Sequence, residues 1–377
     1  MSTALILSGG GARGAYQVGV LKALSDILPR DTYNPFPIIS GTSTGGINAL
    51  ALAGRPGHFR LRMRKLEYIW RSISPDKVYR SDAIGVLKNT IKVMVSFFHS
   101  GYPFGCPVAL FDNSPLKELL QQTVRFRHID EAIASGELQA LCITCMSYTT
   151  GQSVAFFQGS SHHEPWERSR RVGVRTGLTV DHLMASAAIP ALFPAKQIGD
   201  HYYGDGAIRQ LKPLSSALQL GARKLFVVGV SDNPRHKPDM TKPDHPPSIA
   251  QIVSHMFNSA FIDSMEADLE TLHSINRLVE VFDKEERSDL GIDDMRPIDA
   301  LLVTPSQPID VIATEYLNNL PTSLKLFMRA IGATAQGGGA STASFLLFEK
   351  EFCTRLLNMG YRDAMEQEKE IRAFFEC

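Results

Sequence analysis

Short apolar runs alternate along this chain with longer segments whose apolar residues recur at helical spacing. Apolar runs at 5–7, 36–39, 225–230 and 300–304 predict strands. A helix is predicted at 15–28, where the apolar positions are Tyr16, Val20, Leu21, Leu24, Ile27 and Leu28. Strands that alternate with helices predict an α/β fold with a central, mostly parallel sheet between helices.

The remaining patterns place further elements around this core. Two strands joined by a short turn predict a hairpin at 139–158. Further helices are predicted at 59–72, 82–99, 179–188 and 249–275, and in most of 310–377.

This order suggests one main domain with appendages. The α/β domain is expected over 1–305, with a helical insertion at about 59–125. Residues 232–248 contain five prolines without a periodic pattern, which predicts a surface loop. A helical C-terminal extension is expected over 306–377, packed on the same domain, and its role stays open between a cover for the sheet, a dimer surface and a lipid contact.

Two helices of the predicted insertion carry basic residues. In 82–99 an apolar stripe lies opposite Lys88, Lys92 and His99, and the stripe consists of Leu87, Ile91, Met94, Val95 and Phe98. The helix at 59–72 contains Arg60, Arg62, Arg64, Lys65 and Arg71. Either helix could enter a membrane interface or cover an acyl pocket, although such stripes more often pack into a core.

A serine between two glycines follows the second predicted strand. Gly41, Thr42, Ser43, Thr44 and Gly45 come directly after the apolar run. On a turn from strand to helix this spacing exposes the serine hydroxyl, and the N-terminus of the next helix favours negative charge there. Ser43 is therefore a candidate nucleophile, although Gly, Ser and Thr also dominate ordinary turns.

A glycine-rich turn follows the first predicted strand. Consecutive glycines before a helix can aim several peptide N–H groups into one concavity, which suits the oxyanion of an acyl-transfer intermediate. Gly10 and Gly11 are the predicted donors, with Gly9 and Arg13 in the same loop.

The same turn also fits the dinucleotide-binding pattern through Gly9, Gly11 and Gly14. That fingerprint needs an acidic residue at the end of the second strand. Asp31 has roughly the right spacing but precedes a turn, so no cofactor is predicted.

Asp205 is the candidate base. It lies between Gly204 and Gly206, just after the aromatic pair Tyr202 and Tyr203. A tight turn there would project the carboxylate past the backbone, but Gly-Asp-Gly is also common in hairpin turns.

Together these segments resemble the patatin-like phospholipase family, bacterial type. The resemblance rests on Gly-Gly-Gly-Ala-Arg-Gly at 9–14, Gly-Thr-Ser-Thr-Gly at 41–45 and Asp-Gly-Ala at 205–207, with the block 185–194 before the last. It implies a three-layer α/β/α fold, and hydrolysis of lipid acyl esters by a Ser43–Asp205 dyad through an acyl-enzyme. It also implies an oxyanion hole in the glycine loop and supporting roles for Gly14, Gly41, Gly45, Gly206 and Ala207.

Two other functions stay open. An α/β-hydrolase with a Ser-Asp-His triad would need a histidine after Asp205, and the candidates are His236, His245, His255 and His273. A catalytically idle relative would bind lipid or a partner protein through the same pocket.

Composition limits the partners. Lys plus Arg and Asp plus Glu number 39 each, so no basic excess attracts nucleic acid. The five cysteines do not resemble a disulfide framework, because Cys142 and Cys145 fall in a predicted strand and the others are scattered. His162, His163 and Glu164 lack a second ligand pair, so no metal is predicted.

The expected partner is a lipid or phospholipid substrate, and a homo-oligomer stays open. The chain shows neither a secretion signal nor an apolar run of about 18 residues. We therefore expect a cytoplasmic protein that could contact the membrane surface reversibly.

Overall fold

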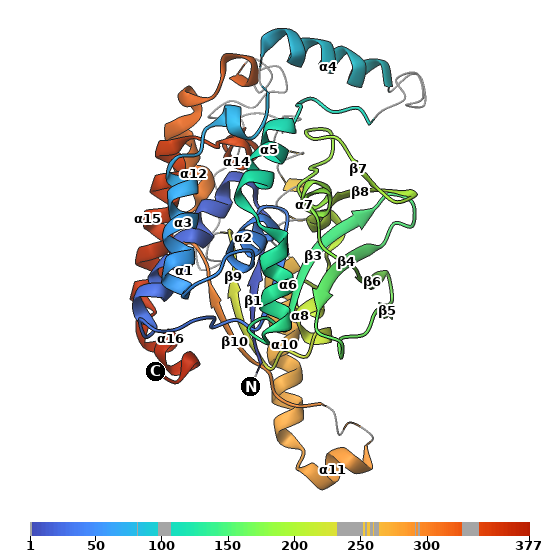
Figure 1. Cartoon of the computed structure of the whole chain (residues 1–377), viewed down its shortest axis with the longest axis vertical. Coiled ribbons are helices and arrows are strands. Elements are labelled where there is room, and N and C mark those ends of the chain that lie inside the picture. The colour runs from blue at the N-terminus through green and yellow to red at the C-terminus, as the bar shows by residue number, and fades with distance from the viewer. Residues whose placement is uncertain are drawn as a thin grey trace, which may run out of the picture.

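The computed structural model describes residues 2–80, 82–96, 107–231, 264–290, 295–325 and 339–377, with Ile252, His255, Met256, Ser259 and Ile292. Its centre is one mixed sheet in the order β10, β9, β1, β2, β3, β4, β6, β5 (Figure 1). The strands are β1 (Thr3–Leu7), β2 (Ile38–Thr42), β3 (Ala140–Ser147), β4 (Ser153–Gly159), β5 (Trp166–Arg168), β6 (Arg171–Arg175), β7 (Lys196–Ile198), β8 (His201–Asp205), β9 (Lys224–Val228) and β10 (Asp299–Val303).

The half of the sheet from β10 to β3 is entirely parallel. The chain then reverses, because β3 and β4 form the predicted antiparallel hairpin. Strands β1 and β9 are buried along nearly their whole length, as parallel strands covered on both faces must be. The predicted α/β class with a mostly parallel sheet is confirmed.

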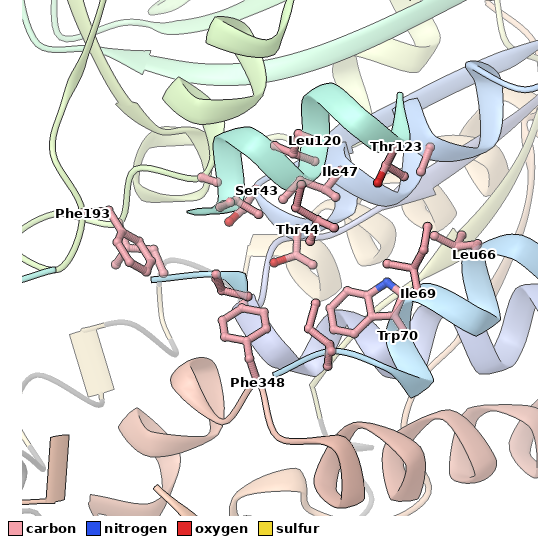
Figure 2. A pocket seen from close by; sticks show the side chains of 18 residues that line it. Ser43, Thr44, Ile47, Leu66, Ile69, Trp70, Leu120, Thr123, Phe193 and Phe348 are labelled. Carbon is pink, nitrogen blue, oxygen red and sulfur yellow. The ribbon is translucent and has the colours of Figure 1, made fainter. Parts of the chain in front are cut away.

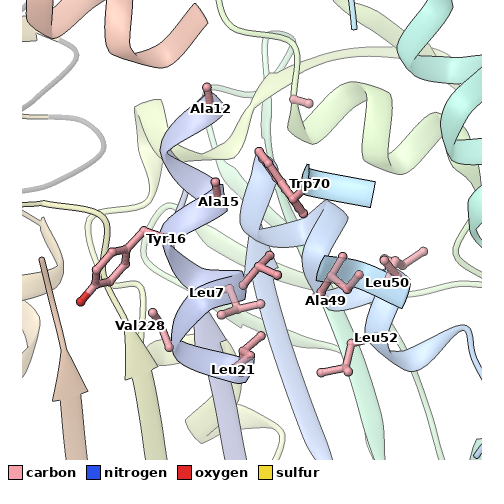
Figure 3. Packing of buried hydrophobic residues seen from close by; sticks show 14 of the residues in the cluster. Leu7, Ala12, Ala15, Tyr16, Leu21, Ala49, Leu50, Leu52, Trp70 and Val228 are labelled. Atoms are coloured by element: carbon pink, nitrogen blue, oxygen red, sulfur yellow. The ribbon is translucent and has the colours of Figure 1, made fainter. Parts of the chain in front are cut away.

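Helices cover both faces of this sheet. The larger apolar cluster joins one face to α1 (Gly14–Ile27), α2 (Thr44–Ala53) and α3 (Phe59–Arg71). Figure 3 shows part of it, with Leu7 of β1 and Val228 of β9 beside Ala15 and Leu21 of α1. The smaller cluster joins the other face to α8 (Ser215–Gln219) and α10 (Ser264–Val281).

The other helices are α4 (Ala83–Ser96), α5 (Ser114–Thr123), α6 (Phe126–Ala134), α7 (Val180–Ser186), α11 (Lys284–Asp289), α12 (Ile309–Tyr316), α14 (Gly339–Leu346), α15 (Lys350–Glu366) and α16 (Glu368–Phe375). Short 3₁₀ turns are η1 (Gly11–Arg13), η2 (Pro75–Lys77), η4 (Gly206–Arg209) and η6 (Leu317–Asn319). The Pro-rich stretch 232–248 and most of the predicted helix before Ser264 lie outside the described residues.

The C-terminal helix α15 lies against α1 on the outside of the sheet (Figure 1). The two backbones approach closely through a pair of glycines. A Cβ at Gly19 would lie 2.0 Å from the Leu357 carbonyl oxygen, and one at Gly360 would lie 2.2 Å from that of Tyr16. Only residues without a side chain permit this contact, so the tail is closely fitted to the helix that follows the glycine loop.

Helix α4 stands apart from the sheet at one end of the molecule (Figure 1). Val86 is buried, whereas Ile91 of the predicted apolar stripe is 55% exposed. The side chains of Leu87, Met94 and Phe98 lie outside the described residues. None of the helices in the described part of the chain combines the length and apolar character that a membrane crossing needs.

Candidate active site

Ser43 and Asp205 come together because two strands end against the same neighbour. Strand β2 runs parallel to β3 and ends at Thr42, opposite Thr144. Strand β8 runs antiparallel to β3 and ends at Asp205, opposite the next residue, Cys145. The carboxyl ends of β2 and β8 therefore meet at one point on β3.

Ser43 occupies the sharp turn between β2 and α2. Its backbone has φ 54° and ψ −127°, a conformation that is strained for a residue with a side chain. The Ser43 N–H donates to Ser186 Oγ at 2.8 Å, and Ser186 Oγ donates to the Thr144 carbonyl at 2.6 Å. This pair of bonds fastens the turn to β3, while the positive end of α2 begins at the next residue.

Asp205 is completely buried. Its Oδ1 accepts a hydrogen bond from the Ala207 N–H at 3.0 Å, whereas Oδ2 has no hydrogen-bond partner among the described residues. Burial raises the pKa of Asp205 to about 7, and the nearby Ser43 hydroxyl and the Ala207 N–H limit that rise. The Ser43 hydroxyl thus lies close enough to influence the carboxylate without forming a full hydrogen bond to it.

The glycine loop runs beside the same turn. Gly11 has φ 55°, and a Cβ there would lie 2.2 Å from the Phe345 carbonyl oxygen, so glycine is required. Gly11 lines the same cavity as Ser43. Gly9 lines a smaller hollow together with Thr42 and Ala207, and Gly10 is the residue directly before η1.

The Arg13 side chain contacts α14. Its guanidinium donates to Ser344 Oγ at 2.7 Å and to Ser341 Oγ at 3.3 Å, and lies 4.3 Å from the centre of the Phe345 ring. The backbone N–H of Arg13 donates to the Gly10 carbonyl at 3.1 Å. That amide is therefore occupied, and Arg13 holds the loop against α14 rather than offering it a further donor.

A buried polar network ties the glycine loop to the serine helix. Gln17 Nε2 donates to the Ser8 carbonyl at 2.8 Å. Asn48 of α2 donates to Gln17 Oε1 at 3.0 Å and to the Gly14 carbonyl at 3.1 Å, and accepts from Trp70 Nε1 at 2.9 Å. Because all these groups are buried, the network resists relative movement of the two segments.

Ser43 lines an apolar cavity that is open to solvent (Figure 2). Helices α2, α3 and α5 supply most of its wall, so the predicted insertion encloses the space above the serine. The lining residues are Gly11, Ser43, Thr44, Ile47, Ala51, Leu66, Ile69, Trp70, Ile73, Val78, Leu116, Leu119, Leu120, Thr123, Ala187, Ile189, Phe193 and Phe348. Only three of these, Ser43, Thr44 and Thr123, have polar side-chain oxygens, which suits a hydrocarbon chain.

Among the described residues no histidine forms a hydrogen bond to Ser43 or Asp205. His273 and His255 are exposed, and His236 and His245 lie outside the described residues. His182 is buried and bonds Thr179 at the start of α7. The described part of the chain also contains no group of three His, Cys, Asp or Glu side chains that could hold a metal ion.

Sequence reasoning missed several groups that position the site. Ser186 fell within the block 185–194 but received no role. Gln210 accepts from Thr42 Oγ1 at 2.6 Å and donates to Thr144 Oγ1 at 3.2 Å, joining β2 and β3 beside Asp205. The only local signal for Gln210 is its position five residues after Asp205. The sequence around Asn48 carries no signal of its role in the buried network.

The site thus combines a mostly parallel α/β sheet with a serine turn beside a buried carboxylate. Sequence comparison assigns the family. The sequence model described as Patatin-like phospholipase matches residues 5–218. The chain therefore belongs to the patatin-like phospholipase family, as predicted.

Two curated relatives are similar to this chain over about half of its length. A cGAMP-activated phospholipase of Pseudomonas aeruginosa (strain BWHPSA011 / Pa011) is 29% identical over 205 residues, 54% of this chain and 52% of the relative. Calcium-independent phospholipase A2-gamma of Mus musculus is 23% identical over 215 residues, 57% of this chain and 25% of the relative. The chain thus spans about half the length of the first and a quarter of the second.

A solved structure, VipD from Legionella pneumophila, aligns with 98% of this chain and 67% of that chain at 13% identity. The TM-score of this alignment is 0.36.

Proposed function

We propose that this chain hydrolyses acyl esters of lipids, as a phospholipase A or lysophospholipase, with Ser43 as nucleophile and Asp205 as base. The observation that carries the proposal is the location of Ser43, on a strained turn in the wall of an apolar cavity and beside a buried carboxylate. Membership of the patatin-like phospholipase family supports the same conclusion.

In the proposed reaction Asp205 accepts the Ser43 proton as Oγ attacks the ester carbonyl carbon. The carbonyl oxygen becomes an oxyanion, and the peptide N–H groups of Gly10 and Gly11 stabilise it. When the intermediate collapses, the C–O bond to the alcohol breaks and Asp205 returns the proton to the leaving oxygen. Asp205 then takes a proton from a water molecule whose oxygen attacks the acyl carbonyl carbon. It passes this proton to Ser43 Oγ as the bond between Oγ and the acyl carbon breaks, which releases the fatty acid and restores Ser43.

Burial of Asp205 supports its role as base. An ordinary aspartate with a pKa near 4 is a poor acceptor for a serine proton. A carboxyl with a pKa of about 7 holds a proton more strongly while still being partly ionised at neutral pH.

The test combines a fluorophosphonate probe with fatty-acid release from phosphatidylcholine and lysophosphatidylcholine. Parent chain should be labelled and active, Ser43→Ala should lose both, and Asp205→Asn should lose activity. Because one relative is named a cGAMP-activated phospholipase, each assay is run with and without cGAMP. Labelling that survives Ser43→Ala would refute the nucleophile.

The same assays separate the alternatives. A triad enzyme would lose activity on replacement of His236, His245, His255 or His273 by alanine, one at a time. An idle relative would bind lipid without releasing fatty acid in any condition.

A further inference from the structure

One side of the apolar cavity adjoins a groove on the outside of the molecule. Ile69, Ile73, Leu119 and Thr123 line both the cavity and this groove, which has a volume of about 790 Å³. No more than a single layer of side chains therefore separates the two spaces. Figure 2 shows Ile69 and Thr123 at the opposite side of the cavity from Phe193.

Among the described residues, the charged ones that line the groove are all basic: Arg55, Lys65 and Lys77. A second groove shares Arg55 and adds Arg62 and Arg125, and the charge of Arg62 is paired with Glu137. Within the described residues Arg55, Lys65, Lys77 and Arg125 form no ion pair. Arg55 donates to the Thr123 carbonyl at 3.3 Å and Lys77 to the Ser72 carbonyl at 2.6 Å, so their hydrogen bonds go to neutral oxygens.

Two of these cations are held close together. Burial, and then the neighbouring charge of Arg125, lower the pKa of Arg55. An anion between like charges relieves their repulsion, so this surface favours a negatively charged ligand.

Exposed apolar side chains lie among the cations. Tyr68 is 65% exposed and Leu61 is 55% exposed, both on α3. The opposite face of α3 carries Leu66 and Trp70 into the cavity. A helix that presents aromatic and aliphatic groups beside basic ones matches the interface of a lipid bilayer better than it matches water.

We propose that this basic face, formed by Arg55, Leu61, Lys65, Tyr68, Lys77 and Arg125, docks on bilayers that contain anionic phospholipids. The proposal rests on the function proposed above. An acyl chain with its ester carbon at Ser43 extends along the cavity towards the groove, so its tail points to the docked bilayer. The product fatty acid then leaves tail first into the membrane, through the layer of Ile69, Ile73, Leu119 and Thr123.

Docking is tested separately from catalysis with the Ser43→Ala chain and flotation on vesicles. Binding should be weak on phosphatidylcholine, strong when a third of the lipid is phosphatidylglycerol, and reduced by high salt. Lys65→Glu with Lys77→Glu should lower the partition constant about tenfold or more. The matched control is Arg168→Glu with Arg170→Glu, two exposed cations at the β5–β6 edge, which should leave binding unchanged.

Activity supplies a second readout with Ser43 intact. The Lys65 and Lys77 reversals should leave hydrolysis of a soluble p-nitrophenyl ester unchanged and reduce hydrolysis of phosphatidylglycerol-containing vesicles. Binding that ignores phosphatidylglycerol, or that falls equally in the control variant, would overturn the proposal. Absence of binding at every composition would also overturn it, in favour of an acidic protein partner. If neither ester is hydrolysed, the proposed function fails while the flotation result still decides docking.

Discussion

The buried guanidinium of Arg13 donates to Ser344 Oγ at 2.7 Å, joining the glycine loop to a helix 331 residues further along the chain. The neighbouring residue of that helix, Phe345, packs on the same guanidinium and places its carbonyl oxygen against Gly11. The family match ends at residue 218. The conformation of the glycine loop thus depends on a segment outside the matched region.

Replacement of Arg13 should therefore damage the chemical step more than substrate binding. In Arg13→Met the loop loses its attachment to α14, and misplacement of one oxyanion donor costs about 2.7–4 kcal/mol of transition-state stabilisation. We expect kcat for a p-nitrophenyl ester to fall on the order of a hundredfold with little change in KM. Arg13→Lys should recover part of kcat, because it restores one donor to Ser341 or Ser344.

The control for this experiment is Phe348→Ala, which enlarges the cavity without touching the loop contacts of Arg13. It should change KM for a long acyl chain and leave kcat for a short ester nearly intact. A rise in KM alone for Arg13→Met, with kcat preserved, would contradict the positioning role.

Sequence alone predicted the fold class and most of the sheet, because its strands are short apolar runs. It also singled out Ser43 and Asp205, because glycines on both sides of each residue are visible locally. It could not assign a partner to Arg13, since the contact with Ser344 depends on how the tail folds back. Nor could it separate a cavity wall from a core, because Leu66 and Trp70 in α3 follow the same helical spacing in either case.

Activity should rise with pH as Asp205 ionises. Only the carboxylate can accept the Ser43 proton, so kcat/KM should fall about tenfold for each pH unit below a midpoint near 7. Carboxyl ionisation has little enthalpy, whereas that of imidazole is large. The midpoint pH of the kcat/KM profile should therefore be the same at low and at high temperature. A midpoint pH that falls on warming would indicate a histidine base.

The same carboxylate should reduce stability at neutral pH. A group whose pKa is about 7 when folded and near 4 when unfolded binds more protons in the folded state between these values. The free energy of unfolding therefore falls as pH rises through this window and is level above it. Asp205→Asn should be stabilising by on the order of a few kcal/mol at pH 8 and by much less at pH 4, measured by urea unfolding. A difference that does not depend on pH would contradict the raised pKa.

Ser186→Ala should weaken the turn that carries Ser43. The change removes the acceptor of the buried Ser43 N–H, and an unsatisfied buried donor costs about 1–3 kcal/mol. We expect lower stability together with a lower kcat, because the strained φ of Ser43 depends on this support. Ser216→Ala is the matched control. The buried Ser216 hydroxyl lies 3.0 Å from Ser40 Oγ, and Ser40 is on β2, the strand that leads to Ser43. It should lose stability but keep kcat, and equal losses of kcat in both variants would argue against a specific role for Ser186.

The acyl-chain preference should follow position along α2. Ile47 and Ala51 both line the cavity, four and eight residues after Ser43, and the helix rises about 1.5 Å per residue. Ala51→Phe therefore places a ring roughly 12 Å along the cavity from the serine. Butanoyl esters should still react at close to the parent rate, whereas hexadecanoyl esters should lose most of their kcat/KM. Ile47→Phe narrows the cavity one turn from Ser43 and should impair both esters. Identical chain-length profiles for the parent and Ala51→Phe would mean that the acyl chain does not lie in this cavity.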